Sequence, residues 1–200
     1  MTETTRATTQ PQTPDGPPKL RADAARNRAR LIEAARAVFL AAPPNTEVSL
    51  EQVARAAGVG IGTLYRHFPT RLELLEAVYR EEVDGLQQAA ERLGPEHPPF
   101  EALELWLEAF VDYAATKRHI FQELIEATGR DSALVTHSRA VMNAAAQAVL
   151  SRAQQAGAVR DDVDAADVLR LVGGCTMMPN FDREQTQRIL KIVMDGLRAP

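Results

Sequence analysis

The stretch VSLEQVARAAGVGIGTLYRHF, residues 48–68, predicts two short helices joined by a tight turn. Ser49 is a favourable N-cap and Gln52 follows three residues later, so the pair forms a capping box. Apolar residues then recur at helical spacing, at Leu50, Val53, Ala54 and Ala57. Gly58 is expected to end this helix, because glycine enters the left-handed backbone region at little cost.

A second short helix is expected from Gly60 to His67, after an apolar residue, Val59, in the turn. Leu64 and Phe68 are expected to face inward and to close a three-helix unit. A helix, a glycine turn and a second short helix form the helix-turn-helix pattern, whose second helix enters the major groove of DNA. The stretch therefore predicts a DNA-binding element.

The run GVGIGTLYRHFPTRLELLEAV, preceded by SLEQVARAA, resembles the DNA-binding domain of TetR-type transcriptional regulators. The resemblance covers the segment from Asp23 to Val78. It implies an all-α fold, with an N-terminal three-helix helix-turn-helix domain and a C-terminal helical bundle that binds a ligand and dimerises. The C-terminal part rests on this resemblance and on its helical pattern, because it carries no comparable motif.

The resemblance also implies which residues contact DNA. Tyr65 and His67 would contact phosphates, Thr63 a phosphate or a base edge, and Ile61 a thymine methyl group. Gly60 departs from the family pattern, in which serine or threonine is common, so backbone N–H groups would bind phosphate there. With few long side chains, shape readout would carry much of the specificity. The full expected set is Arg21, Ser49, Gly60, Ile61, Gly62, Thr63, Tyr65, His67, Thr70 and Arg71.

Arg71 stands where the family usually has lysine, near a backbone phosphate, and the positive end of the helix dipole adds to that attraction.

The assignments of Tyr65 and Arg21 have alternatives. Tyr65 could instead be a tyrosine that packs in the core. Lys19 and Arg21 lie at the end of an arm that reaches the minor groove in some relatives, or else they are charges on a floppy tail.

Charge is distributed unevenly along the 200 residues. The net charge of the chain is −4. From Lys19 to Arg71 there are nine basic and four acidic residues, a net charge of +5, whereas the segment 72–200 carries −8. Phosphate contacts dominate the affinity for DNA, so the basic segment coincides with the motif. For Arg26, Arg28 and Arg30 taken singly, a solvated helix face is the alternative.

The chain divides into three expected parts. Residues 1–21 are rich in Thr, Pro and Gln and predict a disordered arm. Residues 22–68 form the DNA-binding domain, whose first helix runs from Asp23 to Ala42. Residues 69–200 form the ligand-binding and dimerisation domain, and they begin with a connecting helix, 69–93, capped by Thr70 and Glu73. The sequence GPEHPP, residues 94–99, predicts the break after this helix.

Five further helices are expected beyond this break: 100–116, 119–127, 131–155, 163–178 and one capped by Asp182. The last two are apolar on one side, and the resemblance implies that they pair with a second copy in a four-helix bundle. The expected interface residues are Leu169, Val172, Gly173, Ile189, Val193 and Leu197. Alternatively, these helices complete the core of one chain. DNA binding also favours a homodimer, because two DNA-binding domains about 34–36 Å apart can contact both halves of a palindromic operator.

A ligand pocket is expected in the C-terminal domain, lined by Trp106, Phe110, Tyr113, Phe121, Met142, Cys175 and Met178. The first three share one helix face, and plain core packing is the alternative. The acidic excess of this domain favours a cationic ligand or is a solvated acidic surface.

Other chemistries find little support. His119 and Glu123 are four apart on a helix, but no third metal ligand is evident, so neither a metal nor a cofactor is expected. No nucleophile elbow, phosphate loop or cysteine pair occurs, and we expect no enzyme. The single cysteine fits a reducing compartment, and no membrane span or signal peptide is evident, which favours the cytoplasm.

We therefore expect a ligand-responsive, homodimeric transcriptional regulator, acting as a repressor on DNA. The competing hypothesis is a helical small-molecule-binding or catalytic module whose helix-turn-helix is only structural. The operator, the effector and the regulated genes are not encoded in any recognisable pattern, and an activator has the same sequence features as a repressor.

Overall fold

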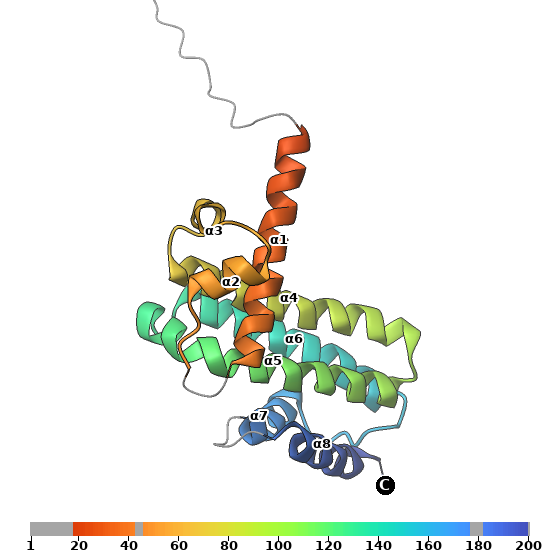
Figure 1. The fold of residues 1–200 in the computed structure, drawn as a ribbon. Helices are drawn as coiled ribbons and strands as arrows, with labels where there is room; N and C mark the ends of the chain where they lie inside the picture. The colour runs from red at the N-terminus through yellow and green to blue at the C-terminus, as the bar shows by residue number, and fades with distance from the viewer. Residues whose placement is uncertain (1–17, 43–45, 177–181, 200) are drawn as a thin grey trace, which may run out of the picture.

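The computed structural model describes residues 18–42, 46–176 and 182–199. Within these ranges the chain forms helices α1 to α8, arranged as a small head (α1–α3) above a larger body (α4–α8) (Figure 1). An isolated β-bridge between Val159 and Arg198 ties the end of the chain to the loop before α7.

Helix α1 spans Pro18–Ala41. It begins five residues before the expected start at Asp23, so the predicted disordered arm is wrong for residues 18–21, and residues 1–17 lie outside the described part. Proline suits the first turn of a helix because its fixed φ is helical and its missing N–H has no partner there. The N-terminal half of α1 projects away from the rest of the molecule (Figure 1).

Helices α2 (Leu50–Ala56) and α3 (Ile61–His67) form the helix-turn-helix. The predicted capping box is confirmed, because Gln52 N–H donates to Ser49 Oγ and Ser49 N–H donates to Gln52 Oε1. Gly58 has a φ of +65°, as the turn requires. The head is held by a compact set of fully buried side chains: Leu31, Ala35, Phe39, Val53, Leu64 and Phe68.

Helix α4 spans Arg71–Glu96 and connects the head to the body. Thr70 is its N-cap and accepts a hydrogen bond from Glu73 N–H. The predicted break at Gly94 is wrong by one turn, since the helix continues through Gly94 and Pro95. Proline has no N–H to donate to the carbonyl four residues before it, and the helix ends soon afterwards at Glu96, where His97 N–H bonds to Leu93 O.

Helix α5 is a single helix, Pro99–Thr128, where two helices with a break after Thr116 were expected. The residues between the two predicted segments include neither glycine nor proline, so nothing in the backbone ends the helix there. Gly129, with a φ of +86°, follows its C-terminus. Helix α5 therefore runs from the far end of the body back to the level of the head.

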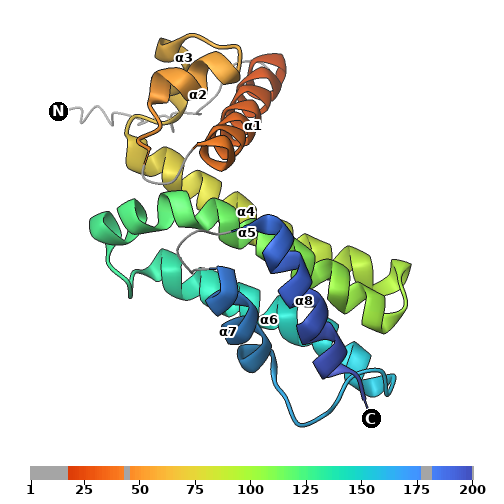
Figure 2. The same ribbon diagram turned by 60° about the horizontal axis from the view of Figure 1, so that its bottom comes forward.

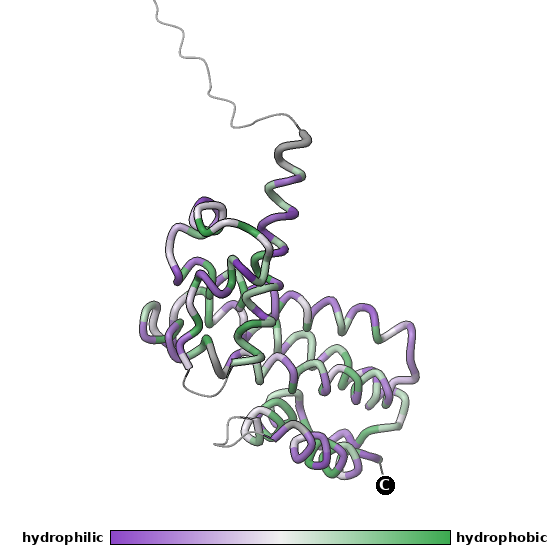
Figure 3. The backbone as a smooth tube through the Cα atoms, in the orientation of Figure 1, coloured by the Kyte–Doolittle hydropathy of each residue, from purple (hydrophilic) through white to green (hydrophobic). Residues whose placement is uncertain are grey.

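Helices α6 (Ala133–Gln155), α7 (Ala165–Thr176) and α8 (Arg183–Leu197) complete the body. Helices α4 and α5 run side by side, and α6, α7 and α8 lie on the side of them away from the head (Figure 2). Hydrophobic and hydrophilic segments alternate along α8, as expected of an amphipathic helix (Figure 3). In the described part of the chain, none of the helices is long and apolar enough to cross a membrane.

Candidate functional site

Helix α3 presents an exposed surface at the outer edge of the head. Leu64 and Phe68 are buried, as predicted, and they anchor the helix to α1 and α2. The opposite face exposes Gly60 and Gly62, together with the larger side chains of Ile61 (37% exposed) and Tyr65 (46% exposed). An exposed tyrosine does not pack in a core, so the packing alternative for Tyr65 is excluded within this chain.

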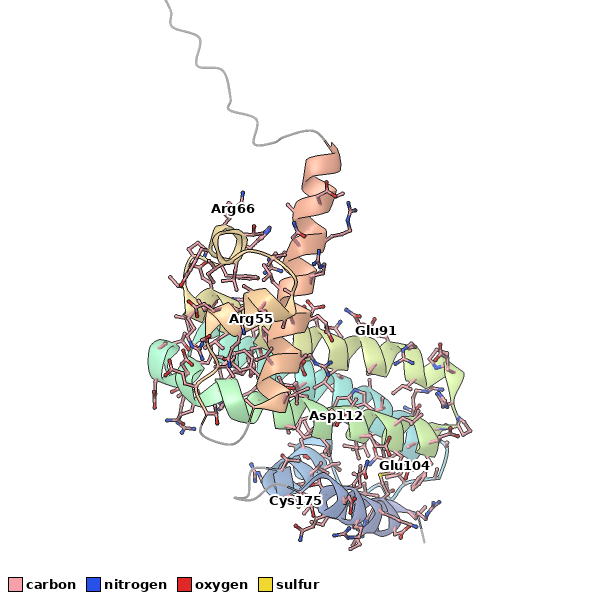
Figure 4. The ribbon with its side chains drawn as sticks, viewed as in Figure 1. Arg55, Arg66, Glu91, Glu104, Asp112 and Cys175 are labelled. Carbon is pink, nitrogen blue, oxygen red and sulfur yellow. The ribbon has the colours of Figure 1, made fainter. Side chains whose placement is uncertain are left out.

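Arg66 also lies on this exposed surface, and the sequence interpretation did not include it. Its guanidinium donates to Thr63 Oγ1 at 2.8 Å and to Gly62 O at 3.3 Å. Arg66 points away from the body at the edge of α3 (Figure 4). Its position one residue after Tyr65 was a usable signal, because an arginine on the outer face of a recognition helix is the commonest phosphate and guanine ligand.

Arginines of α1 hold α3 in place. Arg30 donates to the carbonyl of Ala57 at 2.5 Å, at the end of α2, and its guanidinium lies beside the Gly58 turn. Arg28 lies over the ring of Phe68, 5.2 Å from the centroid. Arg26, Arg28 and Arg30 are all exposed, which agrees with the solvated-face alternative, but Arg28 and Arg30 each also contact the helix-turn-helix, whereas Arg26 pairs with Asp23 on the surface.

The remaining predicted DNA contacts lie around α3. Ser49 and Thr70 cap α2 and α4, so their hydroxyls already accept backbone hydrogen bonds. His67 is partly buried and lines, with Arg28 and Arg80, a depression of about 200 Å³. Arg21 belongs to α1, but its side chain is not among those described.

Arg71 does not face a free surface. Its Nε donates to Glu123 Oε1 of α5 at 2.6 Å, another guanidinium nitrogen donates to Val48 O, and the group lies over the ring of Phe39. These contacts join the start of α4 to both the head and the body, and the expected phosphate contact by Arg71 stays a prediction. Its partner is 52 positions away in the sequence, which no local pattern could indicate.

The expected pocket residues Trp106, Phe110 and Tyr113 lie on one face of α5, as predicted, and all three are buried. Trp106 stacks on Phe110 with ring centroids 5.9 Å apart, and its Nε1–H donates to Leu86 O. Trp106 and Phe110 thus belong to a well-packed core. Met142 is also buried, Phe121 and Cys175 are partly buried, and Met178 lies outside the described residues.

Beside this core, Tyr79 joins the aromatic cluster, although the sequence interpretation did not include it. Its ring lies 6.4 Å from that of Tyr113 and 5.9 Å from that of Phe121. Neither tyrosine hydroxyl forms a hydrogen bond with any described residue. Burial raises the pKa of Tyr113 well above its ordinary value, and the neighbouring Tyr79 hydroxyl raises it further.

The side chain of Lys117 covers the same cluster. Its Nζ lies 3.9 Å from the centroid of the Phe121 ring and 5.7 Å from that of Tyr113. Burial lowers the pKa of Lys117 to about 8, and the positive charge of Arg139 on α6 lowers it further. In the part of the chain that the structure describes, neither cation forms an ion pair.

A groove of about 360 Å³ between α1, α4 and α5 has Tyr113 in its wall. Glu82 lies here, and burial raises its pKa while Arg36, which donates to Glu82 Oε1, opposes the rise. Of the predicted pocket residues, Tyr113 is the one that lines this groove. Asp112 borders it as well (Figure 4).

The expected dimer residues divide into two groups. Val172 and Leu197 are buried in the core of the protomer, so these two are corrected: they complete the chain's own core. Gly173 faces Phe110 and is partly exposed. Leu169, Ile189 and Val193 are partly exposed. The most exposed apolar side chains of α7 and α8 are instead Leu171, 53% exposed, and Ile192, 70% exposed.

The described residues bring no three histidine, cysteine or acidic side chains together in a metal-binding arrangement. Glu123, half of the weak His119–Glu123 pattern, is the partner of Arg71.

Comparisons with known proteins agree with the helix-turn-helix. Residues 31–78 match the model of bacterial regulatory proteins of the tetR family, and residues 98–199 match the C-terminal domain of SbtR-like transcriptional regulators. The chain belongs to the TetR family of transcriptional regulators, which confirms the fold class inferred from the sequence. Since the family and its members found here are transcriptional regulators, the expectation that the chain is not an enzyme is confirmed.

Several relatives are substantially similar. The TetR regulator SCO0520 of Streptomyces coelicolor is 37% identical, with a TM-score of 0.75 over 86% of this chain and 98% of that chain. A TetR regulator of Mycobacterium vanbaalenii is 35% identical, with a TM-score of 0.70 over 90% of this chain and 99% of that chain.

Among curated proteins, the HTH-type transcriptional regulator SrpR of Pseudomonas putida is 34% identical over 62% of this chain. That match spans 56% of SrpR, so the chain covers little more than half of that relative. LfrR of Mycobacterium smegmatis, solved in complex with proflavine, is 22% identical with a TM-score of 0.62 and shares the fold.

Proposed function

We propose that the protein is a homodimeric repressor that binds a palindromic operator through α3 and is released by a small ligand bound in the body. One observation carries the DNA-binding mode: α3 is exposed along its outer face, and arginines of α1 brace it from behind. A short helix held this firmly can enter a major groove without reordering.

The DNA contacts are assigned to Tyr65, Arg66, Thr63 and His67, with Ile61 against a thymine methyl group. Gly60 and Gly62 allow the backbone to approach a phosphate closely. Ser49 and Thr70 stand at helix N-termini, whose N–H groups and dipoles attract anions. Arg66 replaces Arg71 as the main cationic contact, because Arg71 is engaged with Glu123 and Val48.

Operator binding is tested by titrating the protein with duplex DNA from beside its own gene over a range of salt concentrations. Loss of one phosphate contact should reduce the slope of log affinity against log salt by about 1. Arg66→Ala should show this change, and Tyr65→Ala should weaken binding by about tenfold. Arg92→Ala, an exposed arginine at the far end of α4, is the matched control. Equal salt slopes for Arg66→Ala and the control would contradict the assignment of Arg66 as a phosphate contact.

Dimerisation is proposed through the exposed apolar side chains of α7 and α8, centred on Leu171 and Ile192. Leucine and isoleucine side chains that are half-exposed or more on neighbouring helices are typical of a subunit interface. Ile192→Lys should halve the mass in solution and abolish tight binding to a palindrome. Leu40→Lys, on the exposed side of α1, is the control. A wild-type protein of 21.9 kDa in solution, one chain, would contradict the proposal.

Ligand response is proposed to act through α4 and α5. LfrR, which shares the fold, was solved in complex with proflavine, and the body of this chain holds two buried tyrosine hydroxyls that have no hydrogen-bond partner among the described residues. By linkage, a ligand that weakens operator binding must itself be bound more weakly by the DNA complex, by the same factor. The cytoplasm is the proposed location, since chromosomal DNA is the proposed partner.

A further inference from the structure

We infer that the cluster formed by Tyr79, Tyr113, Lys117 and Phe121 binds the acidic group of a carboxylic acid with an apolar body. This inference names the ligand class and rests on the ligand response proposed above. The two tyrosines would donate their hydroxyl protons to the carboxylate, and the Lys117 ammonium would pair with it.

The two hydroxyls are the first reason. Tyr79 and Tyr113 are 0% and 3% exposed, and neither hydroxyl has a hydrogen-bond partner among the described residues. Buried polar groups without partners are rare in folded proteins, because each loses its bonds to water without replacement. Both O–H groups can donate a hydrogen bond to an acceptor placed beside them. A ligand with several acceptor atoms would therefore supply the hydrogen bonds that these hydroxyls do not form within the described chain.

The charge of the cluster is the second reason. Lys117 lies over two rings and has no carboxylate partner in the described chain, and the nearest further charge from α6 is that of Arg139, also positive. A lysine ammonium donates three hydrogen bonds and accepts none. Its depressed pKa records the cost of holding a cation there without an anion. A bound carboxylate removes that cost.

The carboxylates near the cluster do not serve as the anionic partner of Lys117. Glu82 is held by Arg36 on the groove side, and Glu33 lies within 3.9 Å of the same arginine. Glu123, two residues beyond Phe121 on α5, is the partner of Arg71. These three acids therefore have a basic partner, whereas Lys117 and Arg139 pair with no acid among the residues that the structure describes. This imbalance favours an anionic ligand over a cationic one, since a second cation would meet both positive charges.

The apolar body of the ligand would lie against the aromatic cluster. Phe110 and Tyr113 are 5.7 Å apart and continue towards Trp106. Phe121 is partly buried, so the cluster reaches the surface on the Lys117 side. Carboxylic acids with an aromatic or alkyl body therefore match both halves of the cluster.

The test compares three probes that share one ring system: naphthoate, naphthamide and naphthylmethylamine. Binding is measured by calorimetry and by the shift in Tm, at pH 7. A charge-assisted contact should make naphthoate bind at least about tenfold more tightly than naphthamide. Lys117→Met should remove this preference and leave naphthamide binding within about twofold, and Tyr79→Phe or Tyr113→Phe should each weaken naphthoate binding by about threefold or more. Lys191→Met, an exposed lysine on α8, is the control.

A second readout follows Lys117 directly. With lysine amines carrying carbon-13 methyl groups, the Lys117 signal should titrate near pH 8 and move to higher pH when naphthoate is added, while the Lys191 signal stays unchanged. Equal binding of acid and amide, tightest binding of the amine, failure of naphthoate to bind, or undiminished naphthoate binding by Lys117→Met would each overturn the inference.

Operator titrations with the same variants separate this inference from the proposed function. If naphthoate binds through Lys117 but does not weaken operator binding, the inferred ligand site is supported and the proposed ligand response is contradicted. If the protein binds the operator but not naphthoate, the proposed DNA binding is supported and the inferred ligand site is contradicted.

Discussion

The head and the body place their polar side chains differently. In the head, the arginines of α1 reach backbone carbonyls and rings, and the exposed face of α3 is left to solvent. In the described part of the body, two buried tyrosine hydroxyls form no hydrogen bond, and Lys117 lies over two rings without an ion pair. In the head the arginines find partners within the chain, whereas in the body these polar groups are left for the proposed ligand. The difference suits DNA recognition by a rigid element and effector recognition by an enclosed site.

The largest expected effect is in the core of the body. Trp106→Ala removes a fully buried ring stacked on Phe110 and should lower the free energy of unfolding by about 3–5 kcal/mol. Urea unfolding measures the loss, and exposed Gln88→Ala should change stability by less than about 0.5 kcal/mol. If Trp106→Ala also abolished DNA binding while folded, the head and body would not be separable in the way described.

The next effect tests the bracing of the head. Arg30→Met removes the hydrogen bond to Ala57 O and should cost about 1–3 kcal/mol, because a partly buried carbonyl loses a charged donor. Arg26→Met removes only a surface ion pair and should cost about 0–1 kcal/mol. Thermal and urea unfolding compare the two variants. Equal losses would mean that the arginines of α1 are a solvated face after all.

A smaller effect distinguishes the two glycines near α3. Gly58→Ala places a side chain at a φ of +65° and 3.3 Å from Arg30 Nη2, and should destabilise the head by about 1–2 kcal/mol. Gly62→Ala meets nothing within 4 Å and should stabilise α3 by up to about 1 kcal/mol. The free energy of unfolding should therefore change in opposite directions. The same sign for both would contradict the assigned turn.

The smallest effect lies at the junction of head and body. Glu123→Gln weakens the partly exposed pair with Arg71 and should cost about 0.2–1 kcal/mol. The loss should shrink at 1 M salt, where exposed charges are screened. Glu126→Gln, whose carboxylate accepts only from Gln122, is the matched control. A salt-independent loss would show that the pair acts by packing and not by charge.

Local features were predictable because they depend on neighbours in the chain. The Ser49 cap, the Gly58 turn and the burial of Leu64 and Phe68 follow from spacings of three or four residues, which the helix geometry repeats. The predicted helix ends were wrong where glycine and proline did not stop a helix, or where no such residue was present. Helix α4 continued past Gly94, and α5 continued through the residues after Thr116, since burial along each helix supports its continuation.

Most of the missed site residues share another cause. Tyr79 and Lys117 belong to different helices, and only the packing of α4 on α5 brings them to one cluster. Val172 and Leu197 were expected at a subunit interface because α7 and α8 are apolar, but a helical pattern states which residues share a face and not which neighbour covers it.

The amino-acid sequence alone determined the helix-turn-helix, its caps and turn, the separation of a basic head from an acidic body, and the all-α class. These properties depend on periodicity and on contacts within one turn of helix. Only the tertiary structure decided that Arg71 holds Glu123 and that Arg30 supports the turn. It also decided that, among the described residues, two tyrosine hydroxyls form no hydrogen bond and Lys117 forms no ion pair. Those outcomes depend on distances between residues far apart in the chain, which are set by how whole helices pack.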